Sequence, residues 1–358
     1  MSLPAKMKAV VCHAPGKYLY EEIPRPVAGP NELIVKNHGC GICAGDIKAN
    51  HGAAMFWGGA SPWLKAPVVP GHEFFGEIVE MGPGAAEHFD VKLGDLVIAE
   101  QIIPCGKCRF CRDGKYWMCQ PHNIFGFQKD VAEGGMAEYM RYPTNARVHK
   151  IPRELTFEES ILVEPMACSL HTVERAQVGF NDVVVLAGAG TLGLGMIQAI
   201  KLKTPKTFIV LDMNDKRLAL AKKFGADIVM NPGKVDVDAE VKALTDDYGC
   251  DIYIEATGNP AAVTQGLQMV RKLGRFVEFS VFGKETTVDW SVIGDRKELD
   301  ILGSHLGPNC YETVIDLFHR KLITAEGIVT SSFALKDVDE AFKAAETPDA
   351  IKTVFKMV

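Results

Sequence analysis

The 358-residue sequence has no apolar run long enough to cross a bilayer, no stripe of basic residues, no internal repeat and no low-complexity segment. A membrane helix needs about 20 apolar residues, and a nucleic-acid surface needs clustered Lys and Arg. The formal net charge is −6 and the basic residues are scattered, so we expect neither function. Met1–Lys6 also lacks the apolar stretch of a signal peptide, which favours a cytoplasmic protein.

What the chain does contain is apolar residues and cysteine. Hydrophobic residues make up 47% of the sequence, and its length allows two domains with a large core. Ten cysteines are many for a cytoplasmic chain. In a reducing compartment, clustered cysteines indicate metal binding or chemistry before disulfides.

The first third of the chain predicts a β-rich module with many loops. Short strands broken by glycine and proline are expected at Lys8–His13, Glu32–Gly39, Glu77–Met81 and Asp95–Ala99. One helix is then expected from Phe157 to Ala176.

Apolar strands and amphipathic helices alternate in the next part of the chain. The expected strands are Val183–Leu186, Thr207–Leu211, Ile228–Met230, Ile252–Glu255, Arg275–Phe279 and Ile301–Ser304. The expected helices are Leu192–Lys201, Lys216–Phe224, Val237–Leu244 and Ala261–Val270. This alternation predicts right-handed βαβ units and a doubly wound parallel sheet with helices on both faces. The remaining tail, with a helix at Glu312–Lys321, is expected to return to the first module.

A glycine-rich turn follows the first of these strands. The segment GAGTLG (188–193) lies between a strand and a helix, the context in which G-x-G-x-x-G indicates a dinucleotide site. Gly188 permits a tight turn, Gly190 lets the backbone approach a pyrophosphate, and Gly193 lets the helix pack close to the strand. The alternative is a glycine-rich turn that binds nothing. The strand before the glycines, the helix after them and the acidic residue Asp212 further along the chain argue against it.

The neighbouring residues complete the candidate site. The helix N-terminus at Thr191 and Leu192 offers N–H groups and a partial positive charge to phosphates. Asp212 ends the second strand, roughly 20 residues past the glycines, where a carboxylate accepts the ribose hydroxyls and repels a 2′-phosphate. This favours NAD over NADP, although Lys216 and the candidate cofactor residue Arg217 follow closely and would weaken the preference.

Three later strand ends are candidates for the nicotinamide end of the cofactor. They carry Thr257, Ser280 and His305. In open α/β sheets, ligands bind outside the carboxyl ends of the strands. We therefore expect these residues beside the nicotinamide ring.

Four cysteines gather in one loop with the spacing C-x2-C-x2-C-x7-C: Cys105, Cys108, Cys111 and Cys119. Thiolates spaced by two residues can point at one centre, and four of them saturate tetrahedral zinc. Such a site fixes a loop and leaves no position for substrate. An iron–sulfur cluster is the alternative, whereas four unbound cysteines in an exposed loop would oxidise.

Three further segments point to a second metal. Cys43 and Asp46 lie in GICAGD, His72 and Glu73 in GHE, and Glu164 precedes a proline. Each alone has an ordinary explanation: a buried cysteine, a hydrogen-bonded core histidine or a solvated glutamate. Their combination points to a metal site.

The chain here resembles the zinc-containing medium-chain dehydrogenases, which include alcohol, sorbitol and threonine dehydrogenases. The resemblance covers essentially the whole chain, and these motifs occur in the family's order. It implies a β-rich GroES-like catalytic domain over residues 1–164 and 305–358, and a Rossmann NAD-binding domain over residues 165–304. It also implies two zinc ions per chain and a homo-oligomer, either a tetramer or a dimer.

The resemblance implies that Cys43 and His72 bind the catalytic zinc. The third position is a carboxylate, as in the polyol and threonine members, because Glu164 stands where typical alcohol dehydrogenases have cysteine. Glu73 either binds the metal directly or lies behind the ligands while Glu164 or water replaces it. A zinc ion bound by the Cys43 thiolate and one glutamate is formally neutral. With both Glu73 and Glu164 bound, the formal charge of the site is −1, which favours an alkoxide less. We therefore hypothesise that the two carboxylates exchange during turnover.

Other residues of this region have weaker or different roles. Asp46 matches the family acid that supports the ligands, and Cys168 is a weaker candidate ligand. Most relatives have Ser or Thr where this chain has Gly45, and that hydroxyl begins a proton relay. The proton is expected to leave through water, with Lys48 or His51 as candidate carriers.

The implied reaction is oxidation of a secondary alcohol on a small polyol, with hydride transfer to NAD. Zinc lowers the pKa of a bound water to ~7, and a bound alcohol should behave similarly. L-threonine oxidation and a non-catalytic cofactor-binding role are the alternatives.

The substrate pocket also departs from the family. The Arg-Tyr pair of sorbitol dehydrogenases corresponds to Leu306 and Gly307 here, which argues against sorbitol. The aromatic residues of Met55–Trp63, with Phe125 and Phe127, are expected to narrow the pocket. The sequence thus predicts a short polyol, and we hypothesise one of four carbons.

Overall fold

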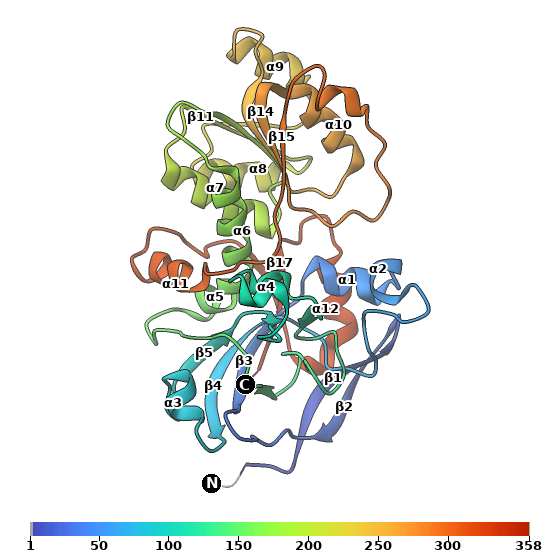
Figure 1. The fold of residues 1–358 in the computed structure, drawn as a ribbon, viewed down its shortest axis with the longest axis vertical. Helices are drawn as coiled ribbons and strands as arrows, with labels where there is room; N and C mark the ends of the chain where they lie inside the picture. The colour runs from blue at the N-terminus through green and yellow to red at the C-terminus, as the bar shows by residue number, and fades with distance from the viewer. Residues whose placement is uncertain (1–2, 358) are drawn as a thin grey trace. The chain divides into compact units, whose positions relative to one another are not determined.

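The computed structural model describes residues 3–357, so Met1 and Ser2 of the N-terminal segment discussed above lie outside the described residues. The chain divides into two compact units: Met1–Glu164 with Tyr311–Val358, and Pro165–Cys310 (Figure 1). The second unit thus ends at Cys310, six residues past the boundary expected from the sequence. Within residues 3–357, no helix has the length and apolarity to cross a membrane.

A seven-stranded sheet forms the frame of the first unit. Its order is β16-β17-β3-β4-β5-β9, with β8 also paired to β3. The strands are β3 (Leu33–Gly41), β4 (Glu73–Met81), β5 (Leu96–Ala99), β8 (Tyr139–Tyr142), β9 (Val148–Lys150), β16 (Val329–Phe333) and β17 (Lys352–Lys356). Because β17 pairs antiparallel with β3, the C-terminal tail returns to the first module, as predicted.

Smaller elements surround this sheet. A hairpin joins β1 (Lys6–Ala14) to β2 (Lys17–Pro24), and β6 (Ile102–Ile103) pairs antiparallel with β7 (Asn123–Ile124) across the loop that holds the four cysteines. The helices are α1 (Ala44–Asn50), α2 (Ala54–Trp57), α3 (Ala85–Phe89), α4 (Arg109–Arg112), α5 (Phe157–Ile161), α11 (Tyr311–His319) and α12 (Val338–Ala345).

A six-stranded parallel sheet forms the second unit, with the order β12-β11-β10-β13-β14-β15. The strands are β10 (Val183–Ala187), β11 (Thr207–Leu211), β12 (Ile228–Met230), β13 (Cys250–Glu255), β14 (Val270–Glu278) and β15 (Asp300–Gly303). The helices are α6 (Val163–Ala176, in this unit from Pro165), α7 (Thr191–Lys203), α8 (Asp215–Lys223), α9 (Val237–Leu244) and α10 (Pro260–Met269).

The strand order reverses direction between β10 and β13. Right-handed crossovers therefore place α7 and α8 on one face of the sheet and α10 on the other. The apolar interiors of the strands, including Val185, Ile209 and Tyr253, fill the core between these layers. In doubly wound folds the ligand binds outside the carboxyl ends of the strands at such a reversal. The predicted combination of a β-rich unit and a doubly wound unit is confirmed.

One predicted helix is wrong in its continuity. The segment expected to be a single helix from Phe157 to Ala176 is two helices, α5 and α6, separated at Leu162. Proline has no N–H to donate to the preceding turn, and it is tolerated in the first turn of a helix. Pro165 therefore falls in the first turn of α6 instead of inside a longer helix.

Candidate metal and cofactor sites

Three side chains of ligand type meet in the first unit: Cys43, His72 and Glu73. One donor atom of each lies within 4.8 Å of the others. Glu73 is 2% exposed, and the His72 side chain is 11% exposed. Thiolate sulfur, imidazole nitrogen and carboxylate oxygen are the donors that zinc takes in proteins.

The pairing of β3 with β4 sets this geometry. Gly41 at the end of β3 pairs with Glu73 at the start of β4. A Cβ on Gly41 would lie 2.1 Å from Glu73 Oε2, so a side chain there would displace the carboxylate. Two residues later Cys43 caps α1, and its N–H donates to the Asp46 carboxylate at 2.9 Å. The end of one strand and the start of the next therefore bring Cys43 toward His72 and Glu73.

Lys352 is a site residue that the sequence analysis missed. Its Nζ donates to both oxygens of Glu73, at 2.7 and 2.6 Å, and to the Ile42 carbonyl at 3.0 Å. The two charged side chains are 4% and 2% exposed. They are 279 positions apart in the sequence, and pairing of β17 with β3 brings them together. Only a prediction of that strand pairing would have found Lys352.

Asp46 lies against the imidazole of His72. Its Oδ1 is 3.7 Å from His72 Nδ1, a buried nitrogen without a hydrogen-bond partner among residues 3–357. Burial raises the pKa of Asp46, and the nearby His72 opposes that rise. A carboxylate facing one ring nitrogen orients the imidazole, which leaves Nε2 for a metal.

Glu164 is buried but lies outside the three-residue group. Its Oε1 accepts a hydrogen bond from Gln101 Nε2, and Gln101 Oε1 accepts one from the Tyr311 hydroxyl at 2.6 Å. The carboxylate that the sequence placed third among the ligands is therefore held in a hydrogen-bonded row. Glu73 is the carboxylate at ligand distance from Cys43 and His72.

The electrostatics of the group fit a cation. Burial raises the pKa of the Cys43 thiol well above its ordinary range, and the Glu73 charge adds to the rise. A thiol in these surroundings stays protonated unless a positive charge offsets the thiolate. Zinc with a thiolate and one carboxylate is formally neutral, so the donor set fits this ion.

An aromatic cluster covers His72: Phe56, Trp63 and Phe127. The Phe127 ring lies 5.4 Å from that of His72, 5.4 Å from that of Phe56 and 4.9 Å from that of Trp63, between centroids. Phe125, which the sequence grouped with these rings, instead packs in the core at 5.1 Å from Phe74. The prediction grouped Phe125 with Phe127 because they are close in the sequence, but the turn at Gly126 points the two side chains in different directions.

Gly45 leaves space beside the three ligand-type residues. A Cβ there would lie 3.8 Å from Cys43 Sγ and 4.0 Å from His72 Cε1, which are ordinary contacts. A serine would therefore fit. His51, a candidate proton carrier, is exposed and its Nε2 lies 2.8 Å from Glu346 Oε1, whereas Lys48 is partly buried.

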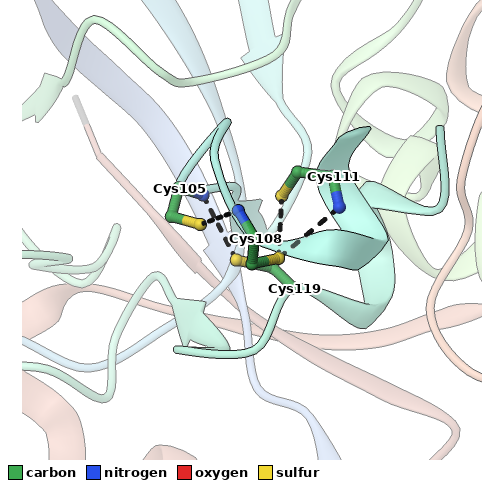
Figure 2. Close-up of side chains that lie close together, drawn as sticks. All are labelled: Cys105, Cys108, Cys111 and Cys119. Carbon is green, nitrogen blue, oxygen red and sulfur yellow. Dashed lines mark hydrogen bonds between the residues drawn. The ribbon is translucent and has the colours of Figure 1, made fainter. Parts of the chain in front are cut away.

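The four cysteines of the loop also converge, as Figure 2 shows. The Cys105 N–H donates to Cys119 Sγ at 3.2 Å, and the Cys108 N–H donates to Cys105 Sγ at 3.3 Å. Cys108 Sγ receives the N–H of Cys111 at 3.5 Å and that of Gln120 at 3.4 Å. These N–H groups lower the pKa of Cys108 to about 6, while burial raises that of Cys111 to about 12. Thiolates held by amide donors around one point fit a four-coordinate metal.

The glycine turn of the second unit has the shape of a phosphate cradle. Gly188 has a φ of +107°, and a Cβ on Gly193 would lie 2.0 Å from the Gly188 carbonyl oxygen. A Cβ on Gly190 would meet nothing within 4 Å, so the space above it is open. Thr191 and Leu192 form the first turn of α7, whose N-terminus has no side-chain cap. Its N–H groups are therefore directed to this open space.

Asp212 links this turn to the next strand. Its Oδ2 accepts the Ala189 N–H at 2.7 Å, and its Oδ1 accepts the Asn214 N–H at 2.8 Å. Lys216 and Arg217 lie in the first turn of α8, and their N–H groups donate to Asn214 Oδ1. The carboxylate is thus fixed beside the glycine turn.

The other strand ends lie at the same edge of the sheet. Thr257 follows β13, Ser280 follows β14 and His305 follows β15, and these strands are parallel neighbours. Glu255 Oε1 fixes the first loop by accepting the N–H groups of Thr257 and Gly258, at 2.7 and 3.0 Å. The structure therefore gathers these three candidate residues at the carboxyl edge of the sheet.

Glu278 stands beside Glu255 across this strand pair and gives a pH-dependent prediction. Burial raises the pKa of Glu278 to about 7, the Glu255 charge adds to it, and Glu278 Oε1 has no hydrogen-bond partner among residues 3–357. The folded state binds this proton more tightly than the unfolded state, so stability falls as the pH rises from about 4.5 to about 7. Glu278→Gln should therefore be more stable than the wild type at pH 8 by about 1–3 kcal/mol, allowing for partial solvent screening.

The measurement is urea unfolding at pH 5 and pH 8. The variant's advantage should be near zero at pH 5 and present at pH 8. Glu240→Gln, at an exposed position of α9, is the control and should show no such difference. An equal effect of Glu278→Gln at both pH values would contradict the assignment.

Hydride transfer from an alcohol to a nicotinamide needs a dinucleotide fold and a means of stabilising charge on the alcohol oxygen. The chain has a doubly wound unit with a glycine turn and, in its other unit, a metal-type donor group. These features define the class of metal-dependent, dinucleotide-linked dehydrogenases.

Comparisons with known proteins give the family. A family model described as an alcohol dehydrogenase GroES-like domain matches residues 29–153, and one described as a zinc-binding dehydrogenase matches residues 191–320. The chain is 47% identical to an erythritol/L-threitol dehydrogenase of Mycolicibacterium smegmatis, covering 94% of this chain and 93% of that protein. It is 34% identical to an L-threonine 3-dehydrogenase of Pyrococcus horikoshii, covering 98% and 99%.

A solved alcohol dehydrogenase of Escherichia coli, in complex with NADH, is 28% identical with a TM-score of 0.87, covering 99% of this chain and 100% of that chain. The chain belongs to the zinc-containing medium-chain alcohol dehydrogenase family. It is therefore an enzyme that uses zinc and a nicotinamide dinucleotide, as the resemblance implied.

Proposed function

We propose that this enzyme oxidises a secondary alcohol of a four-carbon polyol to the ketose, with NAD as hydride acceptor. The observation that carries the proposal is the Cys43–His72–Glu73 group, covered by the aromatic cluster of Phe56, Trp63 and Phe127. Aromatic rings packed against His72, a candidate zinc ligand, reduce the space for a long substrate beside the metal. The relative named for erythritol and L-threitol, which are tetritols, supports the same substrate length.

Cys43 and His72 would hold the zinc with one carboxylate, and four cysteines would hold a second, structural ion. Bound zinc supplies a Lewis acid that favours the ionised form of an alcohol. Asp46 keeps the imidazole of His72 oriented. Lys352 balances the charge of Glu73, so this carboxylate can leave or join the ligands without stranding a buried charge.

We further propose that Glu73 and Glu164 alternate as the carboxylate ligand. When Glu73 is displaced from the metal, the Lys352 ammonium would hold its carboxylate by hydrogen bonds. When Glu164 is displaced, the Gln101 amide would do the same for it. Crystal structures of the apo, cofactor-bound and substrate-bound enzyme test this. The same ligand set in all three would remove the exchange.

The alcohol proton needs a route without the usual hydroxyl at Gly45. We propose water beside Gly45 as the first carrier, with His51 and Glu346 as an acceptor pair at the surface. His51→Asn should lower kcat at acidic pH more than at alkaline pH, where hydroxide replaces the base.

The NAD preference gives a sharper prediction. Asp212→Ser removes the carboxylate that would accept ribose hydroxyls and repel a 2′-phosphate. A hydrogen bond to a charged group contributes about 1.5–3 kcal/mol, so the NAD-to-NADP ratio of kcat/KM should fall by about 10- to 100-fold. Asp215→Asn removes the same charge three residues further on, where the side chain pairs with Lys234, and should leave the ratio almost unchanged. An unchanged ratio in Asp212→Ser would contradict the preference.

Substrate length is tested by NADH formation over tetritols, pentitols, hexitols, L-threonine and simple alcohols. The tetritols should give the highest kcat/KM. Trp63→Ala removes one ring of the aromatic cluster and should raise the hexitol-to-tetritol ratio by about 10-fold, equivalent to about 1.4 kcal/mol. Trp290→Ala, at a 75% exposed position of the second unit, is the control. A hexitol preference in the wild type would overturn the proposed chain length.

L-threonine oxidation is the second candidate, because the Pyrococcus relative bears that name. The substrate panel separates the two candidates directly. A cofactor-binding role without catalysis predicts no NADH formation with any substrate. The intact donor group of Cys43, His72 and Glu73 argues against that role.

We also propose a cytoplasmic homotetramer. Ten cysteines that form no disulfide among residues 3–357 fit a reducing compartment. Size-exclusion chromatography with light scattering tests the tetramer, and a dimer is the other expected outcome of the family resemblance. Cell fractionation tests the location.

A further inference from the structure

A third group of ligand-type side chains lies in the second unit: His171, Glu174 and Cys310. One donor atom of each lies within 4.8 Å of the others. His171 and Glu174 are three residues apart on α6 and therefore share one face of the helix. Cys310 is 2% exposed and is the last residue of this unit. This group shares no residue with the two groups described above.

Hydrogen bonds fix the segment that carries Cys310 to the same helix. The Thr172 and Ser304 hydroxyl oxygens lie 3.1 Å apart. Arg175 Nε donates to the Gly303 carbonyl at 3.2 Å. The chain leaving β15 is thus anchored to α6 at Thr172 and Arg175, which directly follow His171 and Glu174 in the sequence.

Close backbone packing completes the anchor. A Cβ on Gly307 would lie 2.5 Å from the carbonyl carbon of Ala167, so a larger residue would push the segment away from α6. The Cys310 N–H donates to the Gly307 carbonyl at 3.2 Å, which turns the chain back toward the helix. The position of the Cys310 sulfur therefore follows from the fold of the segment.

The chemistry of the three side chains is that of a metal site. The Cys310 thiol donates to Glu174 Oε2 across 3.7 Å. A divalent ion would replace the thiol proton, which would be released to solvent, and would bond the resulting thiolate, the carboxylate and the imidazole of His171. Thiolate and carboxylate together balance two positive charges. The negative charges of the Cys310 thiolate and the Glu174 carboxylate are both needed, because Arg175 adds a positive charge near His171 that would repel a cation. Sulfur, nitrogen and oxygen donors together suit zinc, and water completes four-coordination.

We propose that His171, Glu174 and Cys310 form a third metal site, with zinc as the ion it takes. The site joins α6 to the segment that follows β15, and this segment begins with Ser304 and His305. His305 is a candidate nicotinamide residue. Metal in this site would thus hold the cofactor edge of the second unit in place.

The test is the metal content of the full-length enzyme. Protein purified in the presence of zinc is freed of loose metal by gel filtration, and its zinc is measured by plasma mass spectrometry. Cys310→Ser and His171→Asn should each lose one equivalent relative to the wild type. Cys250→Ser replaces another buried cysteine of the second unit, outside all three groups, and should lose none.

Cobalt(II) gives an independent readout. In the cobalt-reconstituted enzyme, the intensity of the thiolate-to-cobalt charge-transfer band should fall in Cys310→Ser by the contribution of one thiolate. The band should persist in Glu174→Gln, where metal binding weakens but the sulfur ligand remains. If Cys310→Ser does not fold, the exposed Glu174→Gln and the half-buried His171→Asn carry the test through a lower zinc affinity. Zinc content and affinity equal to the wild type in these variants would overturn the proposal, as would an equal loss in Cys250→Ser.

Discussion

Cys43→Ala and His72→Asn are expected to lower kcat/KM for the polyol by at least about 10⁴-fold, equivalent to about 5.5 kcal/mol. Each variant removes a donor from the Cys43–His72–Glu73 group. Without the metal, negative charge on the alcohol oxygen loses its main stabilisation. The upper limit of this stabilisation is about 12 kcal/mol, because zinc lowers the pKa of a bound water by roughly nine units and each unit corresponds to about 1.4 kcal/mol.

The same variants distinguish chemistry from folding. His72→Asn should keep the far-ultraviolet circular dichroism of the wild type and should still bind NADH, because its cofactor-binding candidates are all in the second unit. His88→Asn changes an exposed histidine whose Nε2 lies 2.8 Å from the Thr144 carbonyl, and it should remain fully active. Near-normal activity in Cys43→Ala with an intact fold would rule out a catalytic metal on this residue.

Lys352→Met is expected to destabilise the enzyme by about 3–5 kcal/mol, because it leaves Glu73 buried without its counter-charge. Both partners are almost fully buried, and Lys352 Nζ donates to both carboxylate oxygens. Cys43 and Asp46 add acidic groups nearby, so in the zinc-free enzyme they supply no counter-charge for the unpaired carboxylate. The midpoint of the thermal transition should fall by about 6–10 °C.

Two further variants sharpen this experiment. Lys356→Met makes the same substitution at the exposed end of β17, where Nζ lies 4.8 Å from the Phe157 ring, and should cost under about 1 kcal/mol. Adding Glu73→Gln to Lys352→Met should restore part of the lost stability, because a neutral pair leaves no stranded charge. Equal effects of Lys352→Met and Lys356→Met would show that the buried pair contributes little.

Local patterns predicted the second unit well. Its strands are short apolar runs, and β10 to β13 are each followed by a helix. Capping side chains mark the starts of three of these helices, with Asn214 before α8, Asp236 before α9 and Asn259 before α10. These signals lie within a few residues of the elements they specify. Strand β2 was missed because many of its side chains are exposed, so it lacks an apolar run. Strand β17 was missed because its pairing with β3, which is distant in the sequence, gives no local signal.

The sequence predicted the metal donors but not what surrounds them. Cys43, His72 and Glu73 lie in motifs whose spacing is visible in the chain. Lys352 has no such motif, and its partner Glu73 is 279 positions away. Phe125 and Phe127 are neighbours in sequence, yet they pack against different groups, Phe74 and His72. Side-chain direction beyond a turn depends on the tertiary fold, which the pattern alone does not specify.

The most direct measurement is anomalous X-ray diffraction on crystals of zinc-replete enzyme, collected above and below the zinc absorption edge. The difference map should show a peak bonded to Cys43 Sγ and a ring nitrogen of His72, at about 2.3 Å and 2.0–2.1 Å. The cluster of Cys105, Cys108, Cys111 and Cys119 serves as the internal control. A peak at the four cysteines with none at Cys43 and His72 would contradict the catalytic account.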